Sequence, residues 1–217
     1  MTKWLWIISG PNGAGKSTHT TRMIAKIQAA GFLGDKIIKL NADERTAELK
    51  KQFPDKPEHE LNLQAAKETD AALEKSIGED KPCIFVETVL SSTKYQDDVL
   101  EAKGRGYKIG LVFVSVYPPK LILDRIEDRV AEGGHNVDAQ KALDRYKRSH
   151  VNLVWFGQQA DKLFVYDNSG EQTEAVLVAA KEVGKKLLHK VEGCNPSLDK
   201  AIRSLQKIRP YNPKPSP

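Results

Sequence analysis

Cysteines are scarce in this sequence, and long apolar runs are missing. Its 217 residues include two cysteines, Cys83 and Cys194, too few for a disulfide framework or a four-thiolate zinc site. No apolar run approaches the roughly 18 residues of a membrane span. The short apolar stretch at residues 4–9 leads directly into a glycine loop, without the cleavage region of a signal peptide. We therefore expect a cytoplasmic globular protein, neither secreted nor anchored in a membrane.

The excess of positive charge is small over most of the chain. The sequence has 34 basic and 29 acidic residues, a formal net charge of +5. Residues 191–217 hold five basic and two acidic residues, a net of +3, which leaves only +2 for residues 1–190. A nucleic-acid groove usually requires a basic stripe on the folded body. The charge distribution therefore argues against nucleic acid as a partner.

Apolar strand patterns alternate with helical patterns along the chain. Strands are predicted at residues 4–9, 37–40, 82–86, 107–117 and 163–166. Helices are predicted at 16–30, 58–77, 92–103, 118–133, 138–160 and 173–190, with Asp138 as an N-cap. Nearly continuous apolar strands separated by helices predict an α/β fold, a parallel sheet covered by helices on both faces.

The composition changes after about residue 190. Five of the 11 prolines lie beyond this point, together with most of the excess basic charge. We therefore expect a domain over residues 1–190 and a basic, proline-rich tail over 191–217. Residues 198–208 could still form one helix, because Leu198, Ile202, Leu205 and Ile208 share a face at helical spacing.

A phosphate-binding loop follows the first predicted strand. Residues 10–17 match the pattern G-x-x-x-x-G-K-[ST] at every position, and a predicted helix comes next. Its glycines would let backbone amides converge on phosphate oxygens, while Lys16 neutralises the β- and γ-phosphates and Ser17 ligates Mg²⁺. The pattern predicts ATP and Mg²⁺ as cofactors. The nucleotide-binding residues would be Gly10, Pro11, Asn12, Gly13, Ala14, Gly15, Lys16, Ser17 and Thr18.

Two large classes of phosphate-loop protein lack support in this sequence. The loop resembles that of ABC transporter ATPases, but the chain has no LSGGQ-like signature, and Asp43-Glu44 follows the loop by only some 27 residues. The Asn-Lys-x-Asp guanine motif of GTPases is also missing. A small-molecule kinase fits what remains.

Two carboxylates follow predicted strands at the edge of the sheet where such folds bind ligands. Asp43 follows the second strand and Glu87 the third. Asp43 could accept the proton of an acceptor hydroxyl, and Glu87 could bind that hydroxyl, while either could hold the metal through water. The alternative for Asp43 is helix capping. Thr88 and Ser91 are further candidates for substrate binding, with turn capping as their alternative.

Arginines cluster on two predicted helices joined by a glycine turn. Arg125 and Arg129 share a face of one helix, and Arg145 and Arg148 share a face of the next. Residues 133–135, Gly-Gly-His, lie between them as a hinge. This arrangement predicts a lid over about 125–150 that closes on the transferring phosphates. Solvated salt bridges are the alternative for each arginine taken alone.

The ordered motifs resemble those of the zeta-toxin-like P-loop kinases. They comprise residues 41–44 (Asn-Ala-Asp-Glu), 87–91 (Glu-Thr-x-x-Ser), 129–135 (Arg to His) and 145–153, within a match from about residue 4 to 170. The resemblance implies a nucleoside-kinase-like P-loop NTPase fold with five parallel strands ordered 2-3-1-4-5. It also implies ATP·Mg²⁺ as donor, and as acceptor a hydroxyl of UDP-N-acetylglucosamine or of a related nucleotide metabolite.

The same resemblance implies roles for individual residues and a partner. Asp43 would be the catalytic base, and an antitoxin, if one exists, would block the ATP site. Asn168 would lie near the adenine. Phosphate contacts would come from Arg125, Arg129, Arg145 and Arg148, and substrate contacts from Glu87, Thr88, Ser91 and His135. A polynucleotide 5′-hydroxyl kinase and a non-catalytic ATP-binding switch stay open as alternatives.

Overall fold

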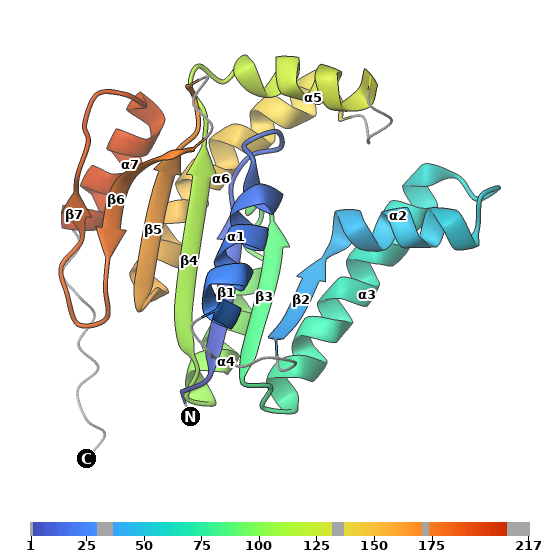
Figure 1. Cartoon of the computed structure of the whole chain (residues 1–217), viewed down its shortest axis with the longest axis horizontal. Coiled ribbons are helices and arrows are strands. Elements are labelled where there is room, and N and C mark those ends of the chain that lie inside the picture. Colours follow the sequence, from blue (N-terminus) through green and yellow to red (C-terminus); the bar gives the residue numbers. More distant parts are fainter. Residues whose placement is uncertain (1, 30–36, 132–136, 171–173, 208–217) are drawn as a thin grey trace.

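The protein is built around one mixed β-sheet with helices on both faces (Figure 1). The computed structural model describes residues 2–29, 37–131, 137–170 and 174–207. The sheet has seven strands in the order β2-β3-β1-β4-β5-β6-β7. The first five are parallel and stand in the predicted order 2-3-1-4-5. They are β1 (Trp4–Ser9), β2 (Ile37–Asn41), β3 (Cys83–Thr88), β4 (Lys108–Ser115) and β5 (Lys162–Asp167).

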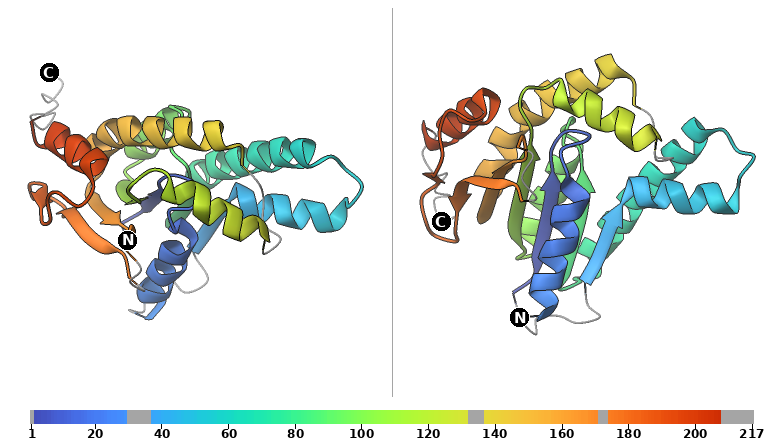
Figure 2. Two further views of the ribbon diagram at one scale, coloured as in Figure 1. Left: turned by 90° about the horizontal axis from the view of Figure 1, so that it is seen from above. Right: turned by 45° about the horizontal axis from the view of Figure 1, so that its top comes forward.

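Alternate residues of β1, the middle one of the five parallel strands, enter two separate cores. Leu5 and Ile7 of β1 belong to the larger core. This core lies beneath α3 (Glu58–Gly78), α4 (Tyr95–Gly104), α6 (Ala139–Gln159) and α7 (Pro196–Lys207). Trp6 and Ile8 point the other way, into the smaller core beneath α1 (Lys16–Ala29). The neighbouring strand accommodates Trp6 with a glycine, because a Cβ at Gly110 would lie 2.2 Å from the indole. Figure 2 shows α1 on one side of the sheet and α6 on the other.

Two helices form an arm beside the β2 edge of the sheet. They are α2 (Ala42–Gln52) and α3 (Glu58–Gly78), and a small core of Leu49, Leu61 and Ala65 joins them. The sequence predicted α3 at 58–77, but α2 was missed. Its sequence is highly charged, and Thr46 and Leu49 are its buried residues. Figure 1 shows that the arm extends beyond the sheet.

Helix α5 (Leu121–Ala131) and the beginning of α6 (Ala139–Gln159) lie above the carboxyl ends of the parallel strands, and the rest of α6 covers one face of the sheet (Figures 1 and 2). Their mutual packing is apolar and includes Ile122, Ile126 and Tyr146. The side chain of Asp138 accepts a hydrogen bond from the Lys141 amide at 2.9 Å, which confirms the predicted N-cap. Helix α4 (Tyr95–Gly104) connects β3 to β4.

The chain after β5 does not form the helix predicted at 173–190. Instead β6 (Val176–Lys181) and β7 (Leu188–His189) extend the sheet in antiparallel orientation. The physical reason is the open edge of β5, whose unpaired backbone groups β6 satisfies. Tertiary pairing of this kind overrides a local helical pattern. The five-stranded sheet expected from the sequence is thus a seven-stranded sheet.

The last described helix, α7 (Pro196–Lys207), packs against α6 and confirms the helix suggested at 198–208. Its buried Leu198 and Ile202 join the larger core. A hydrogen bond also connects the beginning of α7 to the sheet. The buried Asn195, just before α7, donates it through Nδ2 to Asp167 at the end of β5, at 3.1 Å. Among the described residues, no helix combines the length and apolar character needed to cross a bilayer.

Candidate active site

The loop between β1 and α1 has a backbone shape that requires glycine. Gly10, Gly13 and Gly15 have φ angles of +136°, +70° and +90°. A Cβ at Gly10 would lie 1.9 Å from the carbonyl oxygen of Val114, so no side chain fits there. The Oδ1 atom of Asn12 is buried without a hydrogen-bond partner among the described residues. These features suit a loop that presents its backbone to a phosphate group.

Two residues from distant parts of the chain hold this loop from outside. Asn168, just after β5, donates through Nδ2 to the Ala14 carbonyl at 3.0 Å. The guanidinium of Arg125 on α5 donates to the carbonyls of Asn168 at 2.8 Å and Gly13 at 3.4 Å. Both residues were predicted to bind nucleotide, and the structure brings both to the loop. There they bind its backbone carbonyls.

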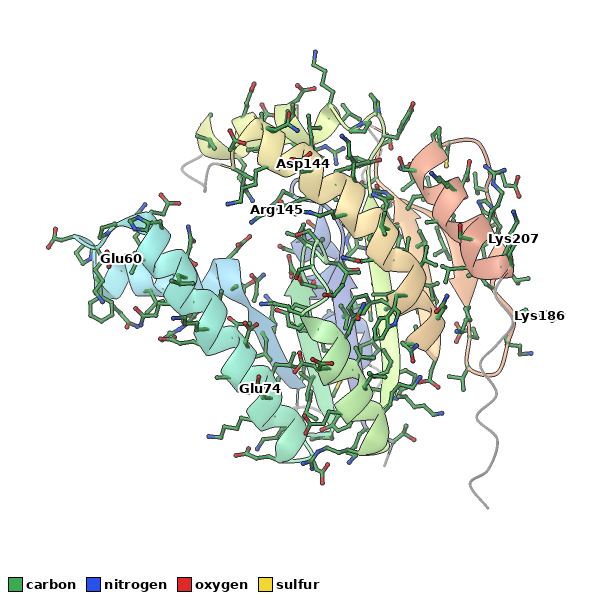
Figure 3. The ribbon with its side chains drawn as sticks, turned by 180° about the vertical axis from the view of Figure 1, so that it is seen from behind. Glu60, Glu74, Asp144, Arg145, Lys186 and Lys207 are labelled. Atoms are coloured by element: carbon green, nitrogen blue, oxygen red, sulfur yellow. The ribbon has the colours of Figure 1, made fainter. Side chains whose placement is uncertain are left out.

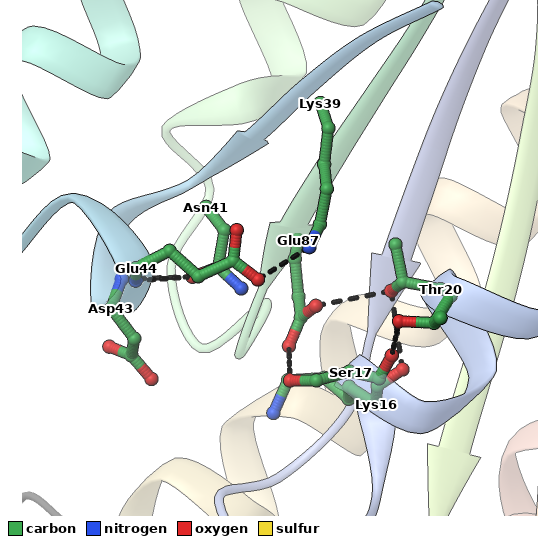
Figure 4. Close-up of polar contacts among 9 residues, drawn as sticks. Lys16, Ser17, Thr20, Lys39, Asn41, Asp43, Glu44 and Glu87 are labelled. Atoms are coloured by element: carbon green, nitrogen blue, oxygen red, sulfur yellow. Dashed lines mark hydrogen bonds and ion pairs between the residues drawn. The ribbon is translucent and has the colours of Figure 1, made fainter. Parts of the chain in front are cut away.

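Glu87, at the end of β3, faces the start of α1. Its carboxylate accepts hydrogen bonds from Ser17 Oγ at 2.8 Å and Thr20 Oγ1 at 3.1 Å, as Figure 4 shows. The sequence analysis singled out Ser17 and Glu87 separately and missed Thr20. The spacing of Ser17 and Thr20, three residues apart on one helix, was the available signal. The predicted metal ligand therefore sits directly beside a carboxylate.

Asp43 lies in the first turn of α2, and it is Asn41 that caps this helix. Asn41 is the N-cap, and its Oδ1 accepts the amides of Asp43 at 2.9 Å and Glu44 at 3.3 Å. Glu44 is committed to an ion pair with Lys39. The Asp43 side chain is exposed and points away from that pair (Figure 4). Helix capping, the alternative explanation of Asp43, therefore does not use its carboxylate.

Several charged side chains of the site affect the pKa of Lys16. Its Nζ donates to the Pro11 carbonyl at 2.9 Å, inside the loop. Burial lowers the pKa of Lys16, and the nearby carboxylates of Glu87 and Asp43 oppose that effect. The positive charges of Arg129 and Arg145 lower the pKa further. Side chains from β3, α2, α5 and α6 thus act together on the lysine of the phosphate loop.

Thr88 and Ser91 lie at the turn after β3. Thr88 Oγ1 accepts a hydrogen bond from the Leu90 amide at 3.2 Å. Thr88 therefore caps this turn, which was the alternative to substrate binding in the sequence analysis. Ser91 and Arg148 line a shared pocket beside α6. Thr18 is exposed at the start of α1. His135, a predicted substrate contact, lies outside the described residues.

Comparison with known families identifies the phosphate-loop core. The model of a protein family described as an AAA domain matches residues 5–153, which include the loop, Asp43, Glu87 and the four arginines. The search of curated proteins found no match.

Solved structures share the fold at low sequence identity. The AvrRxo1-ORF1:-ORF2 structure with ATP is 15% identical, with a TM-score of 0.69 over 97% of this chain and 66% of that chain. The native AvrRxo1-ORF1:-ORF2 complex is 17% identical, with a TM-score of 0.68 over 95% of this chain and 65% of that chain. The present chain thus spans slightly less than two thirds of those chains. A structure of the PezAT chromosomal toxin-antitoxin system of Streptococcus pneumoniae is 13% identical, with a TM-score of 0.55 over 94% of this chain and 78% of that chain. These likenesses concern the fold, and they confirm the predicted α/β P-loop architecture.

Proposed function

Because this chain belongs to the AAA domain family of P-loop proteins, we propose that it is an ATP-dependent kinase with an alcohol acceptor. The acceptor would be a hydroxyl of a nucleotide sugar such as UDP-N-acetylglucosamine, or of a related nucleotide metabolite. One observation carries the proposal. The charges of two carboxylates, Asp43 and Glu87, and of two arginines, Arg129 and Arg145, all act on the pKa of the loop lysine Lys16. A switch protein would need the loop but not these four charged side chains near it.

The donor half of the proposal rests on the phosphate loop. ATP bound with Mg²⁺ would supply the phosphoryl group, and the metal would neutralise charge on its β- and γ-oxygens. The loop amides and Lys16 would hold those phosphates, and Ser17 would turn its hydroxyl to the metal. Glu87, which accepts the hydrogen bond from Ser17, would keep that hydroxyl oriented and could accept hydrogen bonds from water on the metal. The described residues contain no cluster of three or more acidic, histidine or cysteine side chains that could hold a metal independently.

The acceptor half of the proposal rests on Asp43. Its free carboxylate would accept the hydroxyl proton as the acceptor oxygen forms a bond to the γ-phosphorus. The bond from that phosphorus to the bridging oxygen breaks, and ADP leaves with the bridging electron pair. Arg129 and Arg145 would stabilise the charge that spreads over the transferring oxygens. The lid formed by α5 and α6 would exclude water from this step.

A direct assay tests the kinase. The purified protein is incubated with ATP·Mg²⁺ and a panel that includes UDP-N-acetylglucosamine, NAD and a 5′-hydroxyl oligonucleotide, and products are identified by mass spectrometry. Asp43→Asn should reduce product formation by at least about a hundredfold, the usual share of a general base. Asp55→Asn, an exposed position on the same arm, serves as the matched control. Equal activity of Asp43→Asn and wild type would refute the assignment.

The PezAT likeness adds a biological proposal, that the activity is toxic and that an antitoxin blocks the ATP site. Expression of the wild-type chain in a bacterial host should arrest growth, whereas Asp43→Asn at the same level should not. Growth arrest by both proteins would show that the toxicity does not depend on phosphoryl transfer. The cytoplasmic location expected from the sequence is part of the same proposal.

A further inference from the structure

The positive charge of the chain is concentrated towards its C-terminal end, and the proposed kinase reaction does not use it. Residues 181–217 hold nine basic and three acidic residues, a net of +6. Residues 1–180 hold 25 basic and 26 acidic residues, a net of −1. In the described part of the C-terminal segment, the basic residues lie on the hairpin formed by β6 and β7 and on α7.

The protein does not neutralise six of these cations, which are all exposed: Lys185, Lys186, Lys190, Lys200, Arg203 and Lys207. None of the six forms an ion pair within the described residues. The acidic side chains of the same region have other contacts. Glu182 pairs with Lys162 at 3.1 Å. Glu192 and Asp199 lie 3.2 and 3.0 Å from the two ring nitrogens of His189. The region therefore presents free positive charge to its surroundings.

Exposed aliphatic side chains lie among these cations. Four of the ten large hydrophobic side chains that are exposed in the described chain fall within residues 176–191, so they gather on the hairpin. Leu188 is 63% exposed, Val183 43% and Val191 38%. The lysines of the hairpin alternate in sequence with these three residues. The same surface thus offers positive charge and apolar area.

The position of Leu188 in the sheet explains its exposure. Leu188 opposes Ala180 on β6, and Ala180 opposes Phe164 on β5, which packs against the smaller core on the α1 side. Helix α1 packs over β1 and β3, so it leaves β7 uncovered on that side (Figure 1). The next residue, His189, faces Asp199 of α7. The hairpin therefore has α7 on one side and open residues on the other.

Hairpin residues 181–191 and the exposed residues of α7 form one side of the molecule, here called the basic edge. Figure 3 shows Lys186 and Lys207 on this side, whereas Glu60 and Glu74 of α3 lie on the opposite side. Because β6 runs antiparallel to β5, the turn of the hairpin lies at the end of the sheet opposite the phosphate loop. A flat anionic surface would therefore attract the basic edge and leave the lid free.

The composition of the basic edge distinguishes between kinds of anionic partner. Five of its six free cations are lysines, and residues 174–207 contain no phenylalanine, tyrosine or tryptophan. Protein interfaces are depleted in lysine and enriched in arginine and aromatic residues. Nucleic-acid sites use arginine for paired hydrogen bonds and aromatic rings for stacking. Lysines around exposed aliphatic side chains instead suit anionic lipids, whose headgroups attract the charge while the apolar groups enter the interface.

We propose that the basic edge docks this protein on membranes that contain anionic lipids. The contact is peripheral and reversible, since it needs no segment within the hydrocarbon core. Lys185, Lys186 and Lys190 lie at the headgroups, and Leu188 and Val183 enter the interface between them. The phosphate loop stays accessible from solvent during docking. The inference goes beyond the proposed kinase function and does not depend on it.

Flotation with lipid vesicles tests the docking. The full chain is mixed with vesicles of phosphatidylcholine, either alone or with about a third of phosphatidylserine. Wild type should bind the phosphatidylserine vesicles at least about tenfold more tightly, and added salt should weaken this binding. The double variant Lys185→Gln/Lys186→Gln should lose at least about tenfold in affinity for them. The control, Lys50→Gln/Lys51→Gln, removes an exposed lysine pair from α2 and should bind as wild type.

A second pair of variants tests the apolar part of the contact. Leu188→Gln should weaken vesicle binding about fivefold, because it removes an aliphatic side chain from the interface. Its control is Leu63→Gln, at a leucine of α3 that is 58% exposed, which should leave vesicle binding unchanged. Titration with ADP·Mg²⁺ checks that each variant keeps the folded phosphate loop.

Three outcomes would overturn the proposal. One is a wild-type protein that binds both kinds of vesicle equally or binds neither. Another is an equal loss in the two double variants, which would show a response to net charge alone. The third is binding of a short DNA duplex without binding of vesicles, which would assign the basic edge to nucleic acid. The kinase proposal is judged separately by the Asp43→Asn assay, so active protein that ignores vesicles would refute only the docking.

Discussion

Replacement of His150 should remove a large part of the acid sensitivity of this protein. His150 lies on the buried face of α6, in contact with the Phe113 ring. Its Nδ1 is 2.8 Å from the Tyr146 carbonyl, which only accepts, so Nδ1 carries the proton. Its Nε2 then accepts from Ser115 Oγ at 2.9 Å. Both ring nitrogens are thus satisfied in the neutral form.

Burial lowers the pKa of His150 from 6.5 to about 4. At a pH between these values, the unfolded chain carries a protonated histidine and the folded chain a neutral one. The unfolded state binds more protons, so stability is complete above pH 6.5 and falls as the pH falls towards 4. The full shift corresponds to about 3 kcal/mol, of which about 2 kcal/mol is lost between about pH 7.5 and about pH 5.

Urea denaturation at those two pH values measures the effect. The variant His150→Gln keeps a donor and an acceptor but does not titrate, so its stability should fall by about 2 kcal/mol less than that of wild type. Its overall stability will be lower, which does not affect the comparison between the two pH values. His59→Gln, at an exposed position on α3, should keep the full wild-type pH dependence. An equal fall in wild type and His150→Gln would show that another group causes the acid sensitivity.

Two further predictions concern the phosphate loop. Glu87→Gln should slow phosphoryl transfer about 10- to 100-fold and raise the Mg²⁺ concentration needed for half-maximal rate, because Ser17 loses the carboxylate that orients it. An unchanged magnesium requirement would count against that role. Gly10→Ala should abolish ADP binding in calorimetry, because the added methyl group collides with Val114. Gly184→Ala also has a positive φ but faces open space, so it should bind ADP normally, and a similar loss there would implicate general destabilisation.

The sequence allowed a good prediction of the parallel core. Strands such as β4 are buried along almost their whole length, so their apolar runs are continuous and easily recognised. The phosphate loop was equally accessible, because its glycines, Lys16 and Ser17 are adjacent in the chain. Asp43 and Glu87 followed from the rule that ligands bind beyond the carboxyl ends of parallel strands.

Features that depend on distant contacts escaped prediction. The strand β6 forms because β5 offers an open edge, and nothing within residues 176–181 reports that edge. The short helix α2 is stabilised by α3 packing against it, and its own composition is mostly polar. The pocket beside α6 could not be foreseen either, because Asn152 and the turn at Leu90 meet only in the folded chain.

The attachment of the phosphate loop to Arg125 and Asn168 has a consequence for local unfolding. The loop cannot open alone, because opening breaks hydrogen bonds to α5 and to the segment after β5. We therefore expect these three segments to open together in hydrogen exchange, although Gly13 and Arg125 are more than a hundred residues apart in the chain. A ligand that binds the loop alone stabilises all three by mass action, and it protects amides that it never touches.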